Sequence, residues 1–106
     1  MKLNLKAAIS ETKIEKSRHR IMVVDDEPGN LRTLERFLGD TYHVATFECP
    51  KKALEALSAS GPDSEFSLII SDHIMPQMTG VEFLTHLEER RHSAIRVILT
   101  GFAALD

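Results

Sequence analysis

The sequence predicts a single α/β domain built on a doubly wound parallel sheet. Short apolar runs of strand length alternate along the chain with segments whose apolar residues recur at helical spacing. Most of these runs show no polar alternation, which is typical of strands covered on both faces. Such strand–helix alternation implies right-handed crossovers and helices on both sides of the sheet. The length of 106 residues allows one domain of ordinary size.

The apolar run Ile21–Val24 predicts the first strand, which ends abruptly at Asp25. The helix that follows is predicted to begin at Pro28, because a proline in the first helical turn loses no hydrogen bond. Gly39 is the predicted end of this helix. Its apolar residues recur at helical spacing, and they are Leu31, Leu34, Phe37 and Leu38.

Tyr42–Phe47 is the predicted second strand, and its partial alternation of polar and apolar residues indicates a place nearer the sheet edge. The second helix is predicted to begin at Pro50 and to end at Gly61 and Pro62. Its apolar residues are Ala53, Leu54 and Leu57.

The third strand is predicted at Phe66–Ser71, directly before Asp72, and a loop over residues 73–80 follows. The third helix is predicted to bear Phe83 on the flank of its apolar face. The residues on that face are Val81, Leu84 and Leu87. Ile95–Thr100 predicts a fourth strand, after which residues 101–106 begin a further element.

Composition excludes several classes of protein. The net charge of −3 leaves no basic surplus to neutralise nucleic-acid phosphates, so we expect no direct nucleic-acid partner. The single cysteine, Cys49, excludes an internal disulfide and a cysteine-based zinc cluster. No segment approaches the roughly 20 apolar residues that span a bilayer, and the N-terminus lacks the apolar core of a secretory signal. The expectation is a soluble, cytoplasmic domain without membrane contact.

Residues 1–19 differ in composition from the rest of the chain. They are rich in charged and polar residues and poor in large apolar ones, which is typical of a leader or linker. A short amphipathic helix or a short alternating strand are the alternatives for this stretch. The folded domain is therefore predicted at residues 20–106.

Polar residues follow three of the four predicted strands. Asp25 and Asp26 come after the first, Asp72 after the third, and Thr100 ends the fourth. The carboxyl ends of parallel strands lie on one edge of the sheet, where ligands bind at the switch in strand order. If the first and third strands are neighbours, these side chains converge.

Three converging carboxylates repel one another, and a hard divalent cation relieves that repulsion. Mg²⁺ prefers oxygen ligands and is often completed by substrate phosphate. One carboxylate could then act as the nucleophile in phosphoryl transfer, giving an aspartyl phosphate, with Thr100 bonding a phosphoryl oxygen. Simpler interpretations are that Asp25 and Asp26 only cap a helix and that Asp72 is only a turn residue.

Three motifs resemble those of response regulator receiver domains, from about Arg20 to the end of the chain. They are VVDDEP at residues 23–28, LIISDHIMPQMTGVEFL at 68–84 and VILTGFAAL at 97–105. The resemblance implies a flavodoxin-like fold with strand order 2-1-3-4 in this chain. It implies phosphorylation of Asp72 by a histidine kinase or phosphotransfer protein, with Mg²⁺ as the cofactor.

The resemblance also implies a role for each site residue. Asp72 is the expected phosphoacceptor, and it shares the metal with Asp25, Asp26 and the backbone carbonyl of Ile74. Thr100 is the expected switch hydroxyl that contacts the phosphoryl group. Gly101 is expected to leave access to the acceptor. The residues expected to shape the loop are Pro76 and Gly80, which could equally be ordinary turn residues.

The sequence departs from the family pattern at its end. Receiver domains continue through a fifth strand that ends in a lysine and a fifth helix, so this one is expected to be incomplete at its C-terminus. Lys51 and Lys52 open the second helix and cannot replace that lysine. The fourth strand would then present Val97, Ile98 and Leu99 at an unpaired edge, which invites a homodimer or a segment swap.

The expected function is a phosphorylation-driven switch rather than an enzyme with turnover. The alternative is a truncated or degenerate receiver that acts as a docking or dimerisation module. A flavin- or nucleotide-binding protein would need a Ser-, Thr- or Gly-rich loop after the first strand, whereas residues 25–28 read DDEP. A metal-dependent phosphatase would normally have its nucleophilic aspartate after the first strand, not the third.

Overall fold

A computed structural model describes residues 16–59, 65–89 and 93–99 of the chain. Most of the expected leader lies outside these residues, as do the predicted helix end at Gly61 and Pro62 and the two site residues Thr100 and Gly101.

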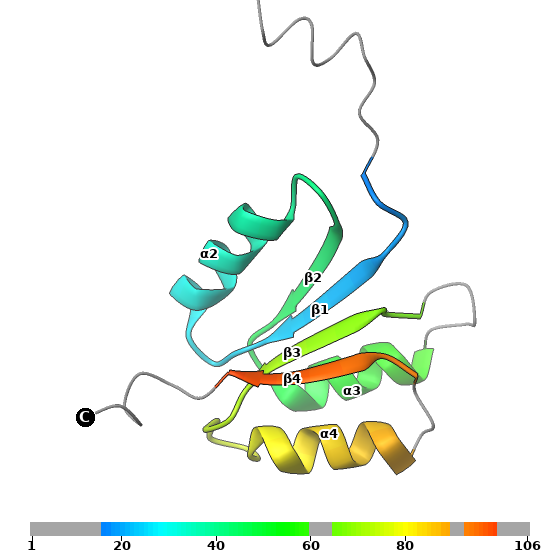
Figure 1. Ribbon diagram of the computed structural model, residues 1–106. Coiled ribbons are helices and arrows are strands. Elements are labelled where there is room, and N and C mark those ends of the chain that lie inside the picture. The colour runs from blue at the N-terminus through cyan, green and yellow to red at the C-terminus, as the bar shows by residue number, and fades with distance from the viewer. Residues whose placement is uncertain (1–15, 60–64, 90–92, 100–106) are drawn as a thin grey trace, which may run out of the picture.

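Four parallel strands form one sheet, and three helices connect them (Figure 1). The strands are β1 (Arg20–Val24), β2 (His43–Phe47), β3 (Leu68–Asp72) and β4 (Ile95–Leu99). The helices are α2 (Pro28–Leu38), α3 (Pro50–Ala59) and α4 (Gly80–Glu89). The strand order is β2-β1-β3-β4, with every neighbouring pair parallel. The predicted fold class and strand order are confirmed.

The central strand β1 explains why its sequence lacks polar alternation. Residues 21–24 are all buried, because β1 pairs with β2 on one side and β3 on the other while helices cover both faces. Ile21 and Val23 face α2, whereas Met22 and Val24 face the opposite side. Strand β2 lies at the end of the strand order, as its partial alternation predicted.

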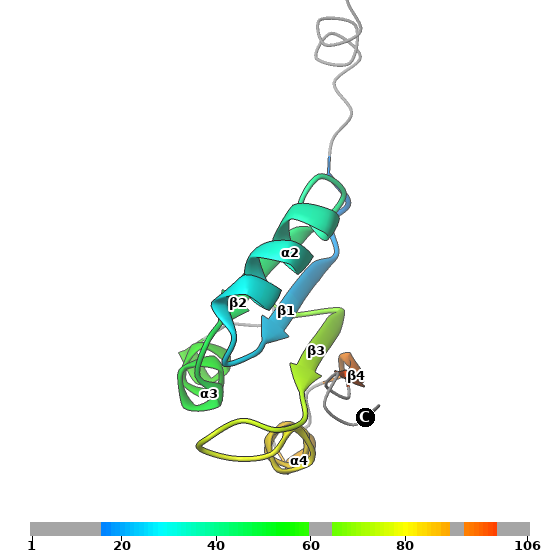
Figure 2. The same ribbon diagram turned by 90° about the vertical axis from the view of Figure 1, so that its left-hand side faces the viewer.

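Two apolar clusters fill the space on either side of the sheet, and the views in Figures 1 and 2 show α2 apart from α3 and α4. The larger cluster joins the sheet to α3 and α4. Its buried residues are Met22, Val24, Ala53, Leu54, Phe66, Ile69, Met75, Phe83, Leu87 and Ala94. The smaller cluster lies under α2 and contains Ile21, Val23 and Leu31. Leu68 and Ile70 of β3 pack against its margin and are only partly buried.

Two aromatic residues do not lie where their spacing suggested. Phe37, predicted on the apolar face of its helix, is 82% exposed. It follows Leu31 by six residues, which is about 240° around a helix axis, so it points away when Leu31 is buried. Phe83, predicted on the flank of α4, is fully buried, and Val81 is 54% exposed. The buried face of α4 follows the pair Phe83 and Leu87, four residues apart.

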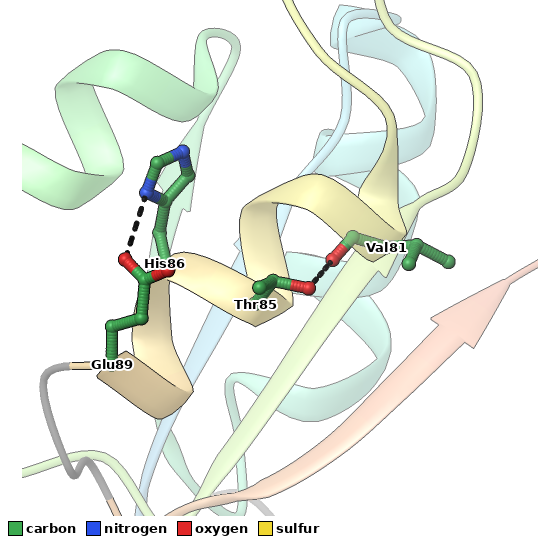
Figure 3. A network of polar contacts seen from close by, with 4 residues as sticks. All are labelled: Val81, Thr85, His86 and Glu89. Atoms are coloured by element: carbon green, nitrogen blue, oxygen red, sulfur yellow. Dashed lines mark hydrogen bonds and ion pairs between the residues drawn. The ribbon is translucent and has the colours of Figure 1, made fainter.

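The outer face of α4 makes local polar contacts, drawn in Figure 3. The Thr85 hydroxyl donates to the Val81 carbonyl at 2.8 Å. His86 Nδ1 lies 3.8 Å from Glu89 Oε2 and forms an ion pair when the imidazole is protonated. Both contacts stay within the helix. Among the described residues, no helix is long and apolar enough to cross a membrane.

Candidate functional site

Three carboxylates gather at the carboxyl edge of the sheet. Asp25 and Asp26 directly follow β1, and Asp72 is the last residue of β3. Because Val24 of β1 is the register partner of Ser71 in β3, the two strands end side by side. One oxygen from each of the three carboxylates lies within 4.8 Å of the other two. Parallel pairing thus brings together acids that are far apart in the sequence.

Asp25 is the most enclosed of the three acids, at 6% exposure. The backbone N–H of Glu27 donates to its Oδ1 at 2.9 Å. The side-chain amide of Asn30 donates to its Oδ2 at 3.1 Å. Its own backbone N–H donates to the carbonyl of Phe47, the last residue of β2, at 3.1 Å. Asp25 is therefore held by groups from its own loop, from α2 and from the neighbouring strand.

Asp72 is half-buried, and its surroundings disfavour its negative charge. Burial raises the pKa of Asp72 above its ordinary value of 3.8, and the charge of Asp25 raises it further. The charge of Asp26 acts in the same direction. Backbone hydrogen bonds from His73 and Ile74 lower the pKa and partly oppose these effects; the His73 N–H donates to Asp72 Oδ1 at 2.8 Å. The net direction is upward, as expected for a desolvated acid beside two others.

The loop after β3 turns back tightly behind Asp72. The Gly80 N–H donates to the His73 carbonyl at 2.7 Å. A Cβ atom at Gly80 would lie 2.6 Å from the Asp72 carbonyl oxygen and 3.1 Å from the His73 Cα. Glycine is therefore required by close approach at this point. Pro76 and the side chain of Ile74 are exposed, whereas Met75 is buried in the larger cluster.

A capping box fixes the start of α4. The Thr79 hydroxyl accepts from the Glu82 N–H at 3.1 Å, and the Glu82 carboxylate accepts from the Thr79 N–H at 3.4 Å. This reciprocal pair satisfies backbone donors that the helix itself leaves free. Together with Met75, the capping box anchors both the middle and the end of the loop that carries Ile74 and Pro76.

Sequence reasoning missed one residue near the acids, Asn30. Asn30, in the first turn of α2, contacts Asp25; its position five residues after an acid and two after a helix-starting proline was the available signal. His73 belongs to the loop predicted over residues 73–80, and it is half-buried. Its Nδ1 atom is buried without a hydrogen-bond partner in the part of the chain that the structure describes.

The three carboxylates form a donor set of the kind that Mg²⁺ takes. They supply only oxygen ligands, and their charges repel one another in a partly buried position. Mg²⁺ prefers such ligands and usually retains water or phosphate in its remaining positions. The residues present therefore fit a hard divalent cation.

The sequence of the chain is similar to those of known regulatory proteins. The chain is 37% identical over 89 residues to the transcriptional regulatory protein FlgR of Helicobacter pylori, covering 82% of this chain and 21% of FlgR. It is 35% identical over 82 residues to the hydrogenase transcriptional regulatory protein HoxA of Cupriavidus necator, covering 77% of this chain and 16% of HoxA. The chain thus spans about a fifth of the length of these relatives or less.

Solved structures share the fold. A protein from Neptuniibacter caesariensis matches with a TM-score of 0.74 and 32% identity, over 87% of this chain and 66% of that one. The response regulator TrrA of Thermotoga maritima, solved in complex with Mg²⁺-BeF, matches with a TM-score of 0.69 and 29% identity, over 81% and 72%. The family model of the response regulator receiver domain matches residues 21–106. By its sequence, its strand order and its acidic edge, the chain belongs to the response regulator receiver domain family.

Proposed function

We propose that this receiver domain accepts a phosphoryl group on Asp72 from a histidine kinase or a phosphotransfer protein, with Mg²⁺ as cofactor. The observation that supports the proposal most directly is the cluster of Asp25, Asp26 and Asp72 oxygens within 4.8 Å of one another. The match to TrrA, whose structure contains Mg²⁺ and a beryllium fluoride group, supports it further. We place this activity in the cytoplasm, without direct contact with nucleic acid or membrane.

Each site residue has a distinct task in this proposal. A carboxylate oxygen of Asp72 attacks the phosphorus of a phosphohistidine whose other ring nitrogen is protonated; an O–P bond forms, the P–N bond breaks with its electron pair going to nitrogen, and the ring leaves as neutral imidazole. The metal would be held by Asp25, Asp26, Asp72 and the Ile74 carbonyl. When bound, Mg²⁺ would supply positive charge that offsets the repulsion among the acids and the negative charge of the phosphoryl oxygens.

The remaining residues act around the reaction. Thr100 would donate its hydroxyl to a phosphoryl oxygen, and Gly101 would leave room for the phosphodonor. Gly80 and Pro76 would keep the loop close behind Asp72. In this proposal the protein acts as a switch, since the phosphoryl group shifts the equilibrium between two conformations that present different surfaces. We do not regard it as an enzyme with turnover.

The test is intact-mass spectrometry after incubation with Mg²⁺ and acetyl phosphate. We expect one added phosphoryl group in the natural sequence and none in Asp72→Asn. Asp40→Asn is the matched control, because Asp40 is an exposed aspartate beyond α2 and should leave the addition unchanged. Addition of a phosphoryl group to Asp72→Asn, or its absence from the natural sequence in folded protein, would contradict the proposal.

A second candidate is a docking or dimerisation module, supported by the exposed apolar side of β4. Ile95, Val97 and Leu99 are 69%, 37% and 44% exposed. In the described part of the chain, β4 pairs only with β3, so its other edge offers free backbone groups to another strand. The two candidates are compatible, because the acids and the middle of β4 lie at different places on the sheet.

A further inference from the structure

We propose that Asn30 is a positioning residue that holds the Asp25 carboxylate ready for Mg²⁺ and thereby sets the affinity of the site. This inference rests on the magnesium site of the proposed function. It concerns a residue that is not itself a metal ligand but contacts one of the ligands, Asp25.

The two hydrogen bonds on Asp25 fix the plane of its carboxylate. Glu27 N–H donates to Oδ1 at 2.9 Å, and Asn30 Nδ2 donates to Oδ2 at 3.1 Å. A carboxylate oxygen can accept more than one bond, so each oxygen keeps a lone pair for a cation. With one donor on each oxygen, rotation about the bond between Cβ and the carboxyl carbon would break at least one contact.

Because Asp25 is buried, its carboxylate depends on these two hydrogen bonds for stabilisation. At 6% exposure, its carboxylate has little access to water, and a buried charge is costly unless protein groups hydrogen-bond to it. The Glu27 donor is a backbone group and survives any substitution except proline. The Asn30 donor is a side chain, so a single substitution removes it and leaves the Asp25 carboxylate held from one side.

The place of Asn30 is itself well defined. It lies in the first turn of α2, where its backbone N–H donates to the Glu27 carbonyl at 3.1 Å. Asparagine is a poorer helix former than alanine, so helix propensity alone does not favour it here. Its amide instead reaches back across the turn to the acid, and this connects the position of α2 to the orientation of Asp25.

Without the amide, the Asp25 carboxylate would have to be ordered again each time a cation binds. Residues that orient metal ligands typically change affinity by about 10- to 100-fold when they are replaced. For Asn30→Ala we expect the dissociation constant for Mg²⁺ to rise by about tenfold. Phosphorylation by acetyl phosphate should slow at low Mg²⁺ and return to within about twofold of the natural rate at saturating Mg²⁺, because Asn30 acts through the occupancy of the site.

The matched control is Thr33→Ala. Thr33 lies one turn further along α2 and is exposed, and its hydroxyl donates to the Gly29 carbonyl at 2.9 Å within the same helix. Replacing it removes a side-chain hydrogen bond of similar length from α2 without touching Asp25. A merely structural role for Asn30 would lower thermal stability and leave the affinity for Mg²⁺ equal to that of Thr33→Ala.

The experiment measures Mg²⁺ binding by calorimetric titration in the natural sequence, Thr33→Ala and Asn30→Ala, each shown to be folded by its amide NMR spectrum. About tenfold weaker binding in Asn30→Ala alone supports the proposal; equal affinity in both variants overturns it. If the natural sequence itself binds no Mg²⁺, the magnesium site of the proposed function fails, and the role of Asn30 fails with it.

A second measurement needs no substitution, should Asn30→Ala fail to fold. The side-chain amide protons of Asn30 are observed by NMR during a Mg²⁺ titration of the natural sequence. We expect them to shift with the same midpoint as the backbone amides around Asp25. Shifts in those backbone amides with no change in the Asn30 side chain would overturn the proposal while leaving the magnesium site intact.

Discussion

The ionised carboxylate of Asp72, which the proposed reaction requires, is disfavoured in the folded protein. Burial and the charges of Asp25 and Asp26 raise its pKa above 3.8. A raised pKa means that the folded protein holds the proton more tightly than the unfolded chain does. The stability that this difference contributes is fully present below 3.8 and is lost as the pH rises through the higher folded-state pKa.

Asp72→Asn should therefore unfold at a higher urea concentration than the natural sequence at neutral pH without divalent cations. The substitution removes a charge that is disfavoured in the folded state, and the advantage should shrink as the pH falls toward 3.8. Added Mg²⁺ should stabilise the natural sequence more than the variant, because the variant lacks one of the three carboxylates. Asp40→Asn serves as control, and a variant that is less stable than the natural sequence at neutral pH would refute this account.

The sequence predicted which acids of the candidate site lie together only where they directly follow a predicted strand. Asp25, Asp26 and Asp72 each follow an apolar run, and parallel pairing then places them together. Asn30 could not be found this way, because its role depends on how the first turn of α2 is oriented relative to Asp25. A single side-chain contact of this kind leaves no repeating pattern of residues in the sequence from which it could be predicted.

At the scale of elements, helical spacing located the helices and most of their packed residues, such as Leu31 of α2 and Ala53 of α3. It misplaced Phe37 of α2 and, in α4, Phe83 and Val81. In α4 the apolar residues lie at several angles around the axis, and only packing against α3 and the sheet decides that Phe83 is buried and Val81 is not. The start of the same helix has a local signal in the sequence that was not among the predictions. Thr79 and Glu82 have the spacing of a capping box, and the structure has both of its hydrogen bonds.

Gly80→Ala tests the junction between β3 and α4. Its Cβ would lie 2.6 Å from the Asp72 carbonyl oxygen, which is backbone and cannot move aside alone. We expect a loss of about 1–3 kcal/mol in the free energy of unfolding, together with slower phosphorylation as Asp72 is displaced. Urea denaturation and acetyl phosphate labelling measure the two effects.

Gly29→Ala is the matched control for that junction, because its Cβ would meet nothing closer than Arg32 Nη2 at 3.9 Å. In a helix, alanine is favoured over glycine by roughly 0.5–1 kcal/mol, so this variant should be as stable as the natural sequence or more so. If Gly80→Ala and Gly29→Ala had equal stability and equal labelling rates, close approach would not be the reason for glycine at position 80.

At the scale of the whole molecule, the strand order was predicted from the resemblance to receiver domains, and the structure confirms it. The alternation pattern by itself indicated only that the second strand lies nearer an edge of the sheet. Neither predicted that α2 covers one face of the sheet only in part. Helix α2 packs on β2 and β1, so Leu68 and Ile70 of β3 stay only partly buried on that side. The apolar side of β4, formed by Ile95, Val97 and Leu99, continues the same uncovered surface.

In the described part of the chain β4 pairs with β3 alone, and a second copy pairing along its other edge would place its own apolar side chains beside Ile95, Val97 and Leu99. We expect the natural sequence to self-associate as its concentration rises in sedimentation velocity. Val97→Lys should shift the equilibrium to monomer, because a charged side chain on an edge strand opposes its pairing with another strand. Val81→Lys changes an exposed valine on α4 in the same way and should leave association unchanged. A natural sequence that stays monomeric at high concentration would show that two copies do not pair through this edge. Equal association in Val97→Lys and Val81→Lys would place the contact elsewhere on the molecule.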